Sequence, residues 1–430
     1  MEAVAQNSGM NPEFRAPQPA QSARIDWANV IIAALLMVAT LPGRTHGLGL
    51  ITEPMLRDLR LDRVSYASLN LWATLMGAVF CLPAGWVFDR FGLRLSTTVI
   101  VVLLGAVVSI MSVYGGDIGF LFGLVMLTRA LGQSALSVAS ITIVGKGASR
   151  RVGFTMGFYS VLMTIFFSLA FKIIGDQVRE QGWRIAWGNI GLVLLAGVAP
   201  VVLFLLPEAK GDSARGEAAA REDTPAGLPL GKALGQPAFW VFAGATSLYG
   251  LVSSGLGLFN QSVFAERGFG QKTYVTFLSV TTLIALVGQM ACGGLTLRWS
   301  MQRLLALAML LYAAGLAFLP RVTTLPQLWL VGTLLGLAGG MVTVIFFAIW
   351  SHAFGRAHLG RIQGAAQMVT VLASAVGPLI FAQCHAHFRS YTPALWILAP
   401  AVLLFGAAAW CVRLPTFAGQ ASSKLTPLAR

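Results

Sequence analysis

The residues with the clearest chemical potential are two arginines inside long apolar stretches. Arg44 and Arg129 lie well within such stretches, whereas none of the 16 Asp and Glu residues does. A guanidinium fork matches the geometry of a carboxylate or a phosphate. Two cations without a buried acid therefore indicate a binding site for an anionic solute. The alternative is structural, since an arginine can snorkel to an interface or bond the backbone carbonyls of a broken helix.

The sequence around Arg44 is rich in residues that loosen a helix. Pro42 and Gly43 precede it, and Gly47 and Gly49 follow it. Irregular backbone inside a membrane is tolerated only where it is buried or lines a cavity, and interrupted helices indicate the binding sites of transporters. We therefore expect Arg44 to lie at a break in a membrane-spanning helix.

Two titratable residues follow Arg44 on the same helix. His46 and Glu53 are seven residues apart and share one helix face. Histidine titrates near neutral pH, and desolvation raises the pKa of a glutamate towards that range, so the pair can relay protons. The alternative interpretation of His46 is a packing role.

Neutral polar side chains are the candidates for the rest of the site. Gln133 lies one turn after Arg129 on the same face of its helix. The candidates in the second half of the chain are all amides, namely Asn260, Gln261, Gln289, Gln363 and Gln367. For each of these amides, interhelical packing is an equally good interpretation.

The elements that must position these residues follow from the composition. Of the 430 residues, 56% are hydrophobic and 11% are charged, and the mean hydropathy is +0.74. A soluble domain carries about 25% charged residues, so this chain lacks an ordinary water-facing surface. The apolar runs are continuous rather than alternating, which favours membrane-spanning helices over barrel strands. The net charge of +14 is spread between these runs and does not indicate a nucleic-acid-binding face.

We predict an all-α membrane protein with twelve transmembrane helices in two pseudo-symmetric six-helix bundles. The bundles are expected over 27–206 and 237–413, joined by a polar cytoplasmic linker over 207–236. A disordered cytoplasmic N-terminus over 1–26 and a cytoplasmic tail over 414–430 complete the chain. The twelve helices are predicted over 27–54, 64–88, 95–114, 118–146, 153–175, 185–206, 237–263, 272–296, 302–319, 326–350, 360–384 and 393–413.

Loop charges and a repeated spacing support this arrangement. With the N-terminus inside, 18 Lys and Arg residues fall in cytoplasmic segments and 10 in outer loops, as the positive-inside rule requires. The pair Gly153 and Gly157 in the first half corresponds to Gly360 and Gly364 in the second. Their matching topological positions are typical of a duplicated six-helix unit.

A short charged loop joins the second and third predicted helices and contains Gly85, Asp89, Arg90, Gly92 and Arg94. This spacing resembles the signature loop of the major facilitator superfamily, Gly-x-x-x-Asp-Arg-x-Gly-x-Arg or Lys, and the resemblance covers essentially the whole chain. The glycines permit a close helix approach and a tight turn. Asp89 can contact the N-terminus of a neighbouring helix or a basic side chain. We expect these contacts to hold the inner gate in one state.

Two branches of that superfamily show further similarity. The Arg129-x-x-Gly132 spacing and the sequence Gly182-Trp183-Arg184 resemble the monocarboxylate and oxalate–formate carriers. Arginines on the first and fourth helices are similar to those of the organic anion symporters. However, the eighth helix has no charge where monocarboxylate carriers place a basic residue, and the first helix lacks the acidic neighbour of the symporters. The subfamily therefore stays open.

These features predict a secondary active transporter that moves a small organic anion, a carboxylate, by alternating access. Proton symport or anion exchange would drive it, because the sequence has no nucleotide-binding loop. The alternative is efflux of hydrophobic or amphipathic compounds through an aromatic cavity. We expect no enzyme activity, metal or other cofactor, because no nucleophile–base pair or metal-like cysteine spacing occurs within the spans. The expected setting is a bacterial-type plasma membrane, where the chain works as a monomer with the solute and lipid as partners and without nucleic acid.

Overall fold

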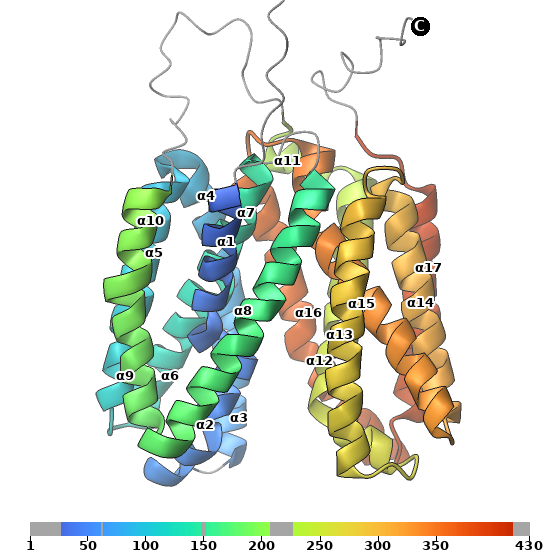
Figure 1. Cartoon of the computed structure of the whole chain (residues 1–430), viewed down its shortest axis with the longest axis horizontal. Helices are drawn as coiled ribbons and strands as arrows, with labels where there is room; N and C mark the ends of the chain where they lie inside the picture. Colours follow the sequence, from blue (N-terminus) through green and yellow to red (C-terminus); the bar gives the residue numbers. More distant parts are fainter. Residues whose placement is uncertain (1–26, 62, 148–151, 207–226, 416–430) are drawn as a thin grey trace, which may run out of the picture.

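The computed structural model describes residues 27–61, 63–147, 152–206 and 227–415, and these are almost entirely helical. Helices satisfy every backbone hydrogen bond internally, as an apolar solvent requires. The helices form two bundles that stand side by side (Figure 1). The predicted N-terminal segment 1–26 lies outside the described residues, as do most of the predicted linker and nearly all of the predicted tail.

The first bundle contains the elements from Trp27 to Leu205. They are α1 (Trp27–Ala39), the 3-10 turn η1 (Leu41–Gly43), α2 (Thr45–Asp58), α3 (Arg63–Val79), α4 (Cys81–Phe91), α5 (Leu93–Val113), α6 (Ile118–Thr128), the π-helix η2 (Arg129–Leu136), α7 (Ser137–Gly147), α8 (Val152–Gln181), α9 (Trp183–Leu192), the π-helix η3 (Val193–Val198) and α10 (Ala199–Leu205).

The second bundle contains the elements from Leu230 to Cys411. They are α11 (Leu230–Leu234), α12 (Pro237–Ala265), α13 (Gln271–Leu295), α14 (Met301–Phe318), the 3-10 turn η4 (Leu319–Arg321), α15 (Leu325–Phe354), α16 (Leu359–Phe388) and α17 (Thr392–Cys411).

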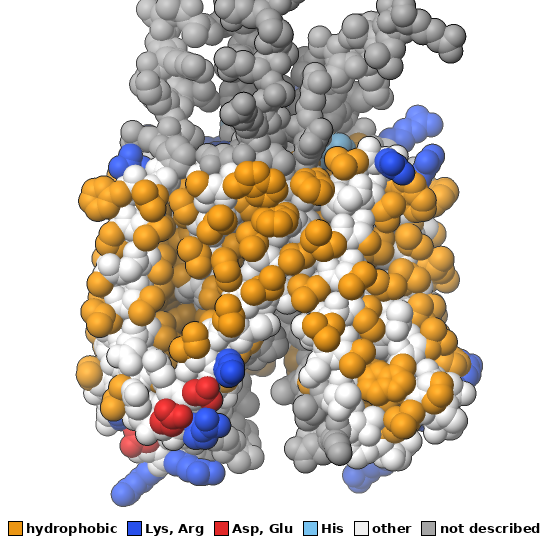
Figure 2. Space-filling view, viewed as in Figure 1, with side chains coloured by type: hydrophobic (Ala, Val, Ile, Leu, Met, Phe, Trp, Pro, Cys, Tyr) orange, Lys and Arg blue, Asp and Glu red, His pale blue; other side chains and the backbone are white. Residues whose placement is uncertain are grey.

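Among the described residues, eleven helical spans are long and apolar enough to cross a membrane. The twelfth is the pair α1–η1 and α2, which bends by 43° at its break. The prediction of an all-α protein with twelve spans is therefore confirmed. Figure 2 shows the matching surface, with hydrophobic side chains over the height of both bundles and charged ones at the two ends.

The end of the predicted linker differs from the expected flexible chain. Gly227 forms an isolated bridge with Gly355, and the backbone N–H of Leu228 donates to Phe354 O at 2.9 Å. The short helix α11 follows. The linker thus ends in ordered structure that rests on the turn between α15 and α16.

Two faces of the molecule are defined by their turns. The linker face carries the α4–α5 turn at Gly92, α11 and the α15–α16 turn at Gly355, and the opposite face carries the turns at Gly182 and Gly268 (Figure 1). Which face meets the cytoplasm stays a prediction. The bundles meet towards the linker face, and a notch separates them at the opposite face (Figure 2).

Glycines allow the two bundles to touch at two helix crossings. At the first, α4 packs on α16, and a Cβ added to Gly85 would lie 2.2 Å from Gly360 O. At the second, α8 packs on α13, and a Cβ added to Gly157 would lie 2.8 Å from Gly293 Cα. Both glycine pairs of the repeated spacing therefore lie where one bundle contacts the other.

Candidate functional site

The first span breaks where its sequence predicts a break. Pro42 and Gly43 form the 3-10 turn η1, and Arg44 follows in an extended conformation with φ −98° and ψ 150°. A Cβ added to Gly43 would lie 2.1 Å from Thr128 O, so only glycine permits this close approach to α6. The break therefore packs directly against the span that carries Arg129.

Arg129 lies at the start of a second irregular element, the π-helix η2. Its side chain is 1% exposed. Nη1 donates to Gly43 O at 3.1 Å, to Thr45 Oγ1 at 3.1 Å and to Gln133 Oε1 at 2.7 Å, and Nη2 donates to Asn70 Oδ1 at 2.6 Å. These acceptors are all neutral. They orient the guanidinium at the break between α1 and α2 but leave its charge uncompensated.

Arg44 is less enclosed than Arg129 and contacts different helices. Nε donates to Thr40 Oγ1 at 2.6 Å, and Nη2 donates to Ser137 Oγ at 3.0 Å and to Met37 Sδ at 2.9 Å. The Phe167 ring centroid lies 5.5 Å from Cζ, a cation–π distance. Within the described part of the chain, Nη1 of Arg44 has no hydrogen-bond acceptor. The two N–H groups of this nitrogen are therefore available to bond a solute.

The two arginines form a region of positive potential inside the first bundle. Nη1 of Arg129 donates to the carbonyl of Gly43, the residue directly before Arg44. Among the described residues, neither forms an ion pair with an Asp or Glu. Electrostatic forces are stronger in a medium of low dielectric constant than in water. The arrangement can therefore attract and hold an anion.

The residues that sequence analysis missed are the neutral partners of the two arginines. They are Thr40, Thr45, Asn70 and Ser137. Asn70 is an amide inside an otherwise apolar stretch, and this feature of the sequence could have identified it as a site residue. A threonine or serine is too common in membrane helices to stand out.

The amides of the second bundle differ in their partners. Gln289 is 5% exposed and donates from Nε2 to Thr164 Oγ1 of α8 at 3.2 Å. Gln363 is 0% exposed, and no described residue bonds either of its amide atoms. Oε1 of Gln367 also lacks a described partner. Gln289 is therefore already engaged, whereas Gln363 and Gln367 hold unused capacity.

The helices of these amides contact the elements of the arginine network. α16 packs against α3, η2 and α7, which carry Asn70, Arg129 and Ser137. α13 packs against α8, which carries Phe167. Four predicted site residues have side chains outside the described part of the structure, namely His46, Glu53, Asn260 and Gln261.

Asp89 joins the two bundles at the linker face. Its side chain is almost fully buried and accepts hydrogen bonds from the backbone N–H groups of Gly360, at 3.3 Å, and Arg361, at 3.0 Å. These groups belong to the first turn of α16, where a carboxylate is favoured by the helix dipole. Lys146 Nζ lies 2.9 Å from Asp89 Oδ1. The contacts are of the kind that the loop sequence indicates, and their role in gating stays a prediction.

The other residues of this loop shape the turn. Gly92 has φ +84°, a conformation that L residues rarely adopt. The guanidinium of Arg90 lies 5.3 Å from the Trp86 ring centroid, and Nε of Arg94 donates to Leu203 O. The loop is therefore fixed within the first bundle and presents Asp89 to the second.

At the opposite face, a second carboxylate, Asp58, joins two helices of the first bundle. Nε of Arg184 donates to Asp58 Oδ2 at 2.8 Å, and Nε1 of Trp183 donates to the same oxygen at 3.2 Å. The sequence Gly182-Trp183-Arg184 thus joins the start of α9 to the end of α2. Its arginine is neutralised by Asp58, in contrast to Arg44 and Arg129.

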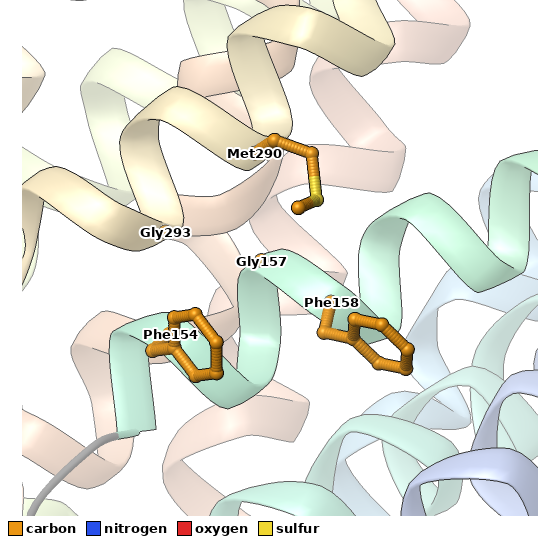
Figure 3. Close-up of a pocket in the computed structure, with 5 residues that line it drawn as sticks. All are labelled: Phe154, Gly157, Phe158, Met290 and Gly293. Carbon is orange, nitrogen blue, oxygen red and sulfur yellow. The ribbon is translucent and has the colours of Figure 1, made fainter.

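A small pocket at the second crossing does not suit an anion (Figure 3). Its lining consists of Phe154, Gly157, Phe158, Met290 and Gly293. All five residues are apolar, and they come from α8 and α13. The pocket is therefore part of the contact between the bundles and is not the candidate site.

Comparisons with known proteins agree with this architecture. The family model described as Major Facilitator Superfamily matches residues 32–378 and 276–427. The solved structure of the human organic anion transporter MFSD10 (TETRAN) is similar, with a TM-score of 0.66 and 16% identity, over 91% of this chain and 100% of that chain. A variant of the E. coli fucose:proton symporter FucP has a TM-score of 0.65 and 12% identity, over 90% of this chain and 98% of that chain. At these identities the structural likeness shows the fold alone. A search of the curated proteins finds no match.

Proposed function

This chain belongs to the Major Facilitator Superfamily of membrane transporters, and we propose that it moves a small organic anion, a carboxylate, by secondary active transport. The observation that carries the proposal is the pair of guanidinium groups of Arg44 and Arg129. They lie inside the first bundle without an acidic partner among the described residues. Intramembrane cations are costly and mark substrate or ion pathways.

The two arginines have different parts in the proposed binding step. Arg44 keeps Nη1 available and supplies the direct hydrogen bonds to a solute carboxylate. Arg129 is bonded to neutral acceptors of η1, α2 and α3, so it holds the helix break in place and adds positive charge. The bound anion reduces the repulsion between the two guanidinium groups. The site therefore favours an anion over a neutral or cationic solute.

The second bundle completes the proposed site with neutral groups. Gln367 lies on α16, the helix that packs against η2 and α3, and its oxygen has no hydrogen-bond partner among the described residues. An amide can bond a hydroxyl or a carboxylate of the solute without adding charge. Binding across the two bundles then couples the solute to their relative motion, as alternating access requires.

Transport is proposed to run on proton symport or anion exchange. The similar structures include proteins described as an organic anion transporter and as a fucose:proton symporter. His46 and Glu53, on the helix α2 that follows the break, are the candidates for a proton relay. The proposed setting is a bacterial-type plasma membrane, in which one chain forms a complete transport unit.

Reconstitution into liposomes tests the proposal. Uptake of labelled lactate, oxalate, succinate and benzoate is measured with and without a pH gradient, and each unlabelled acid serves as competitor. We expect one carboxylate to accumulate and to be displaced by its analogues. Tetraphenylphosphonium, a lipophilic cation, should not compete. Uptake that this cation abolishes and that no carboxylate affects would contradict the anion site and favour efflux of hydrophobic compounds.

A further inference from the structure

A pair of aromatic side chains on α8 lies beside the guanidinium group of Arg44. Cζ of Arg44 is 5.5 Å from the centroid of the Phe167 ring. The Phe171 ring, one helical turn further along α8, stacks on Phe167 with 5.8 Å between the centroids and 28° between the ring planes. Both rings keep part of their surface exposed. The cation with available N–H groups therefore borders an apolar surface made of two aromatic rings.

This aromatic surface is turned towards the second bundle. Thr164, Phe167 and Phe171 share one face of α8, because residues three and four positions apart are neighbours on a helix. The hydroxyl of Thr164 accepts from Nε2 of Gln289 in the second bundle, so this face of α8 points to that bundle. From Thr164, α8 continues to the opposite face of the molecule (Figure 1), where a notch separates the bundles (Figure 2). The two rings thus lie between the Thr164 contact and the level of the notch.

The charges beside this surface suit a solute with a single carboxylate. Arg44 has one terminal nitrogen without an acceptor among the described residues. Arg129 is 1% exposed, and both of its terminal nitrogens are bonded to neutral acceptors. One accessible guanidinium edge matches one carboxylate. A second carboxylate on the solute would lie against the aromatic rings, where a charge loses its hydration without gaining a partner.

We propose that the solute is a monocarboxylate that carries an aromatic ring. Arg44 bonds its carboxylate, and its ring packs against Phe167 and Phe171, where ring–ring contact adds to the burial of apolar surface. Phe167 determines specificity, because it contacts the guanidinium and the ring of the solute at once. The inference rests on the proposed function, since it requires Arg44 to bind a carboxylate, and it adds the chemical class of the rest of the solute.

Calorimetric titration of the purified full-length protein with four carboxylates tests the proposal. Benzoate has an aromatic ring and one charge, cyclohexanecarboxylate has a saturated ring, acetate has no ring, and terephthalate has a second carboxylate on the aromatic ring. Competition against benzoate measures the Kd of the weaker ligands. We expect benzoate to bind more tightly than the other three, and about tenfold or more tightly than acetate, since burial of a ring-sized apolar group contributes this factor.

Phe167→Leu keeps an apolar side chain at this position but removes the ring. The ratio of the acetate Kd to the benzoate Kd should fall by about threefold or more, because the ring–ring contact is lost. Phe204→Leu, at a side chain of α10 that is 74% exposed, is the matched control and should keep the ratio of the parent chain. A purely structural effect on Arg44 would weaken the binding of all four carboxylates alike and leave the ratio unchanged.

The possible results separate this inference from the proposed function. Binding of acetate, cyclohexanecarboxylate or terephthalate to the parent chain as tightly as benzoate would overturn the inference, and this comparison needs no variant. An unchanged Kd ratio in the folded Phe167→Leu protein would overturn it as well. In both cases the proposed function would stand, because a carboxylate still binds. Binding of no carboxylate, or an unchanged benzoate Kd in Arg44→Gln, would contradict the proposed function and the inference with it.

Discussion

The two bundles share one fold but present different chemistry to each other. The first encloses Arg129 and partly encloses Arg44. Among the described residues, the second buries no Lys, Arg, Asp or Glu, and its buried polar groups are neutral amides and hydroxyls. The two helical bundles therefore differ in the charge of their buried groups. In the proposed function, the first bundle recognises the charge of the solute and the second its hydrogen-bonding groups.

The largest effect is expected from removing the more deeply buried cation. Arg129→Ala deletes a positive charge and four hydrogen bonds that hold the helix break. We expect carboxylate uptake in liposomes to fall by about 100-fold or more, because hydrogen bonds to charged groups contribute about 1.5–3 kcal/mol each. The exposed Arg321, converted to Ala, is the matched control and should leave uptake unchanged. Uptake at the wild-type rate by Arg129→Ala would contradict the proposal that the first bundle recognises the charge of the solute.

A smaller effect is expected at the arginine with an available donor. Arg44→Gln keeps a polar side chain but loses the charge and the fork. The apparent KM for the carboxylate should rise about tenfold or more, as expected for one lost charge-assisted contact. The maximal rate should change less than the KM. Concentration-dependent uptake measures both values. A KM that stays at the wild-type value would show that Arg44 does not touch the solute.

A moderate effect is expected at the contact between the bundles. Asp89→Asn preserves the shape of the side chain but weakens its bonds to the α16 N-terminus and Lys146. We expect uptake to fall several-fold while the KM changes little, since this residue lies away from the arginines. Asp176→Asn, at an exposed ion pair with Arg179, is the control. Equal uptake by both variants would mean that Asp89 does not set the transport cycle.

The smallest effect is expected in the pairing of Gln289. Thr164→Val removes the hydroxyl that accepts from this amide. A lost neutral hydrogen bond costs about 1 kcal/mol, so uptake should change by no more than about fivefold. Liposome uptake at saturating solute measures the change. A loss of uptake as large as that of Arg129→Ala would show that this amide contributes as much to transport as the arginines of the first bundle, in contradiction to the account.

The sequence predicts those features that depend on local pattern. Continuous apolar runs locate the spans, Pro42 and Gly43 locate the break, and the loop around Asp89 indicates a contact with a helix N-terminus. Each of these follows from residues near one another in the chain. The subfamily and the solute are not fixed by such patterns.

Features that depend on helix pairing could not be predicted. Asn70 and Ser137 become partners of the arginines only because α3 and α7 pack beside the break. Gln289 and Gln363 look alike in sequence, yet among the described residues only Gln289 has a hydrogen-bond partner. The roles proposed for His46 and Glu53 stay predictions.

The central claim is that the positive charge of Arg129 attracts the anion that Arg44 bonds, and Asn70→Asp tests it most directly. The substitution is nearly isosteric and places a carboxylate where Oδ1 now lies 2.6 Å from Nη2 of Arg129. If the charge binds the anion, this internal carboxylate neutralises it, and carboxylate uptake should fall by about 100-fold while the folded protein melts no lower. If Arg129 only holds the helix break, the stronger bond preserves that role. Wild-type uptake by Asn70→Asp would therefore contradict the account.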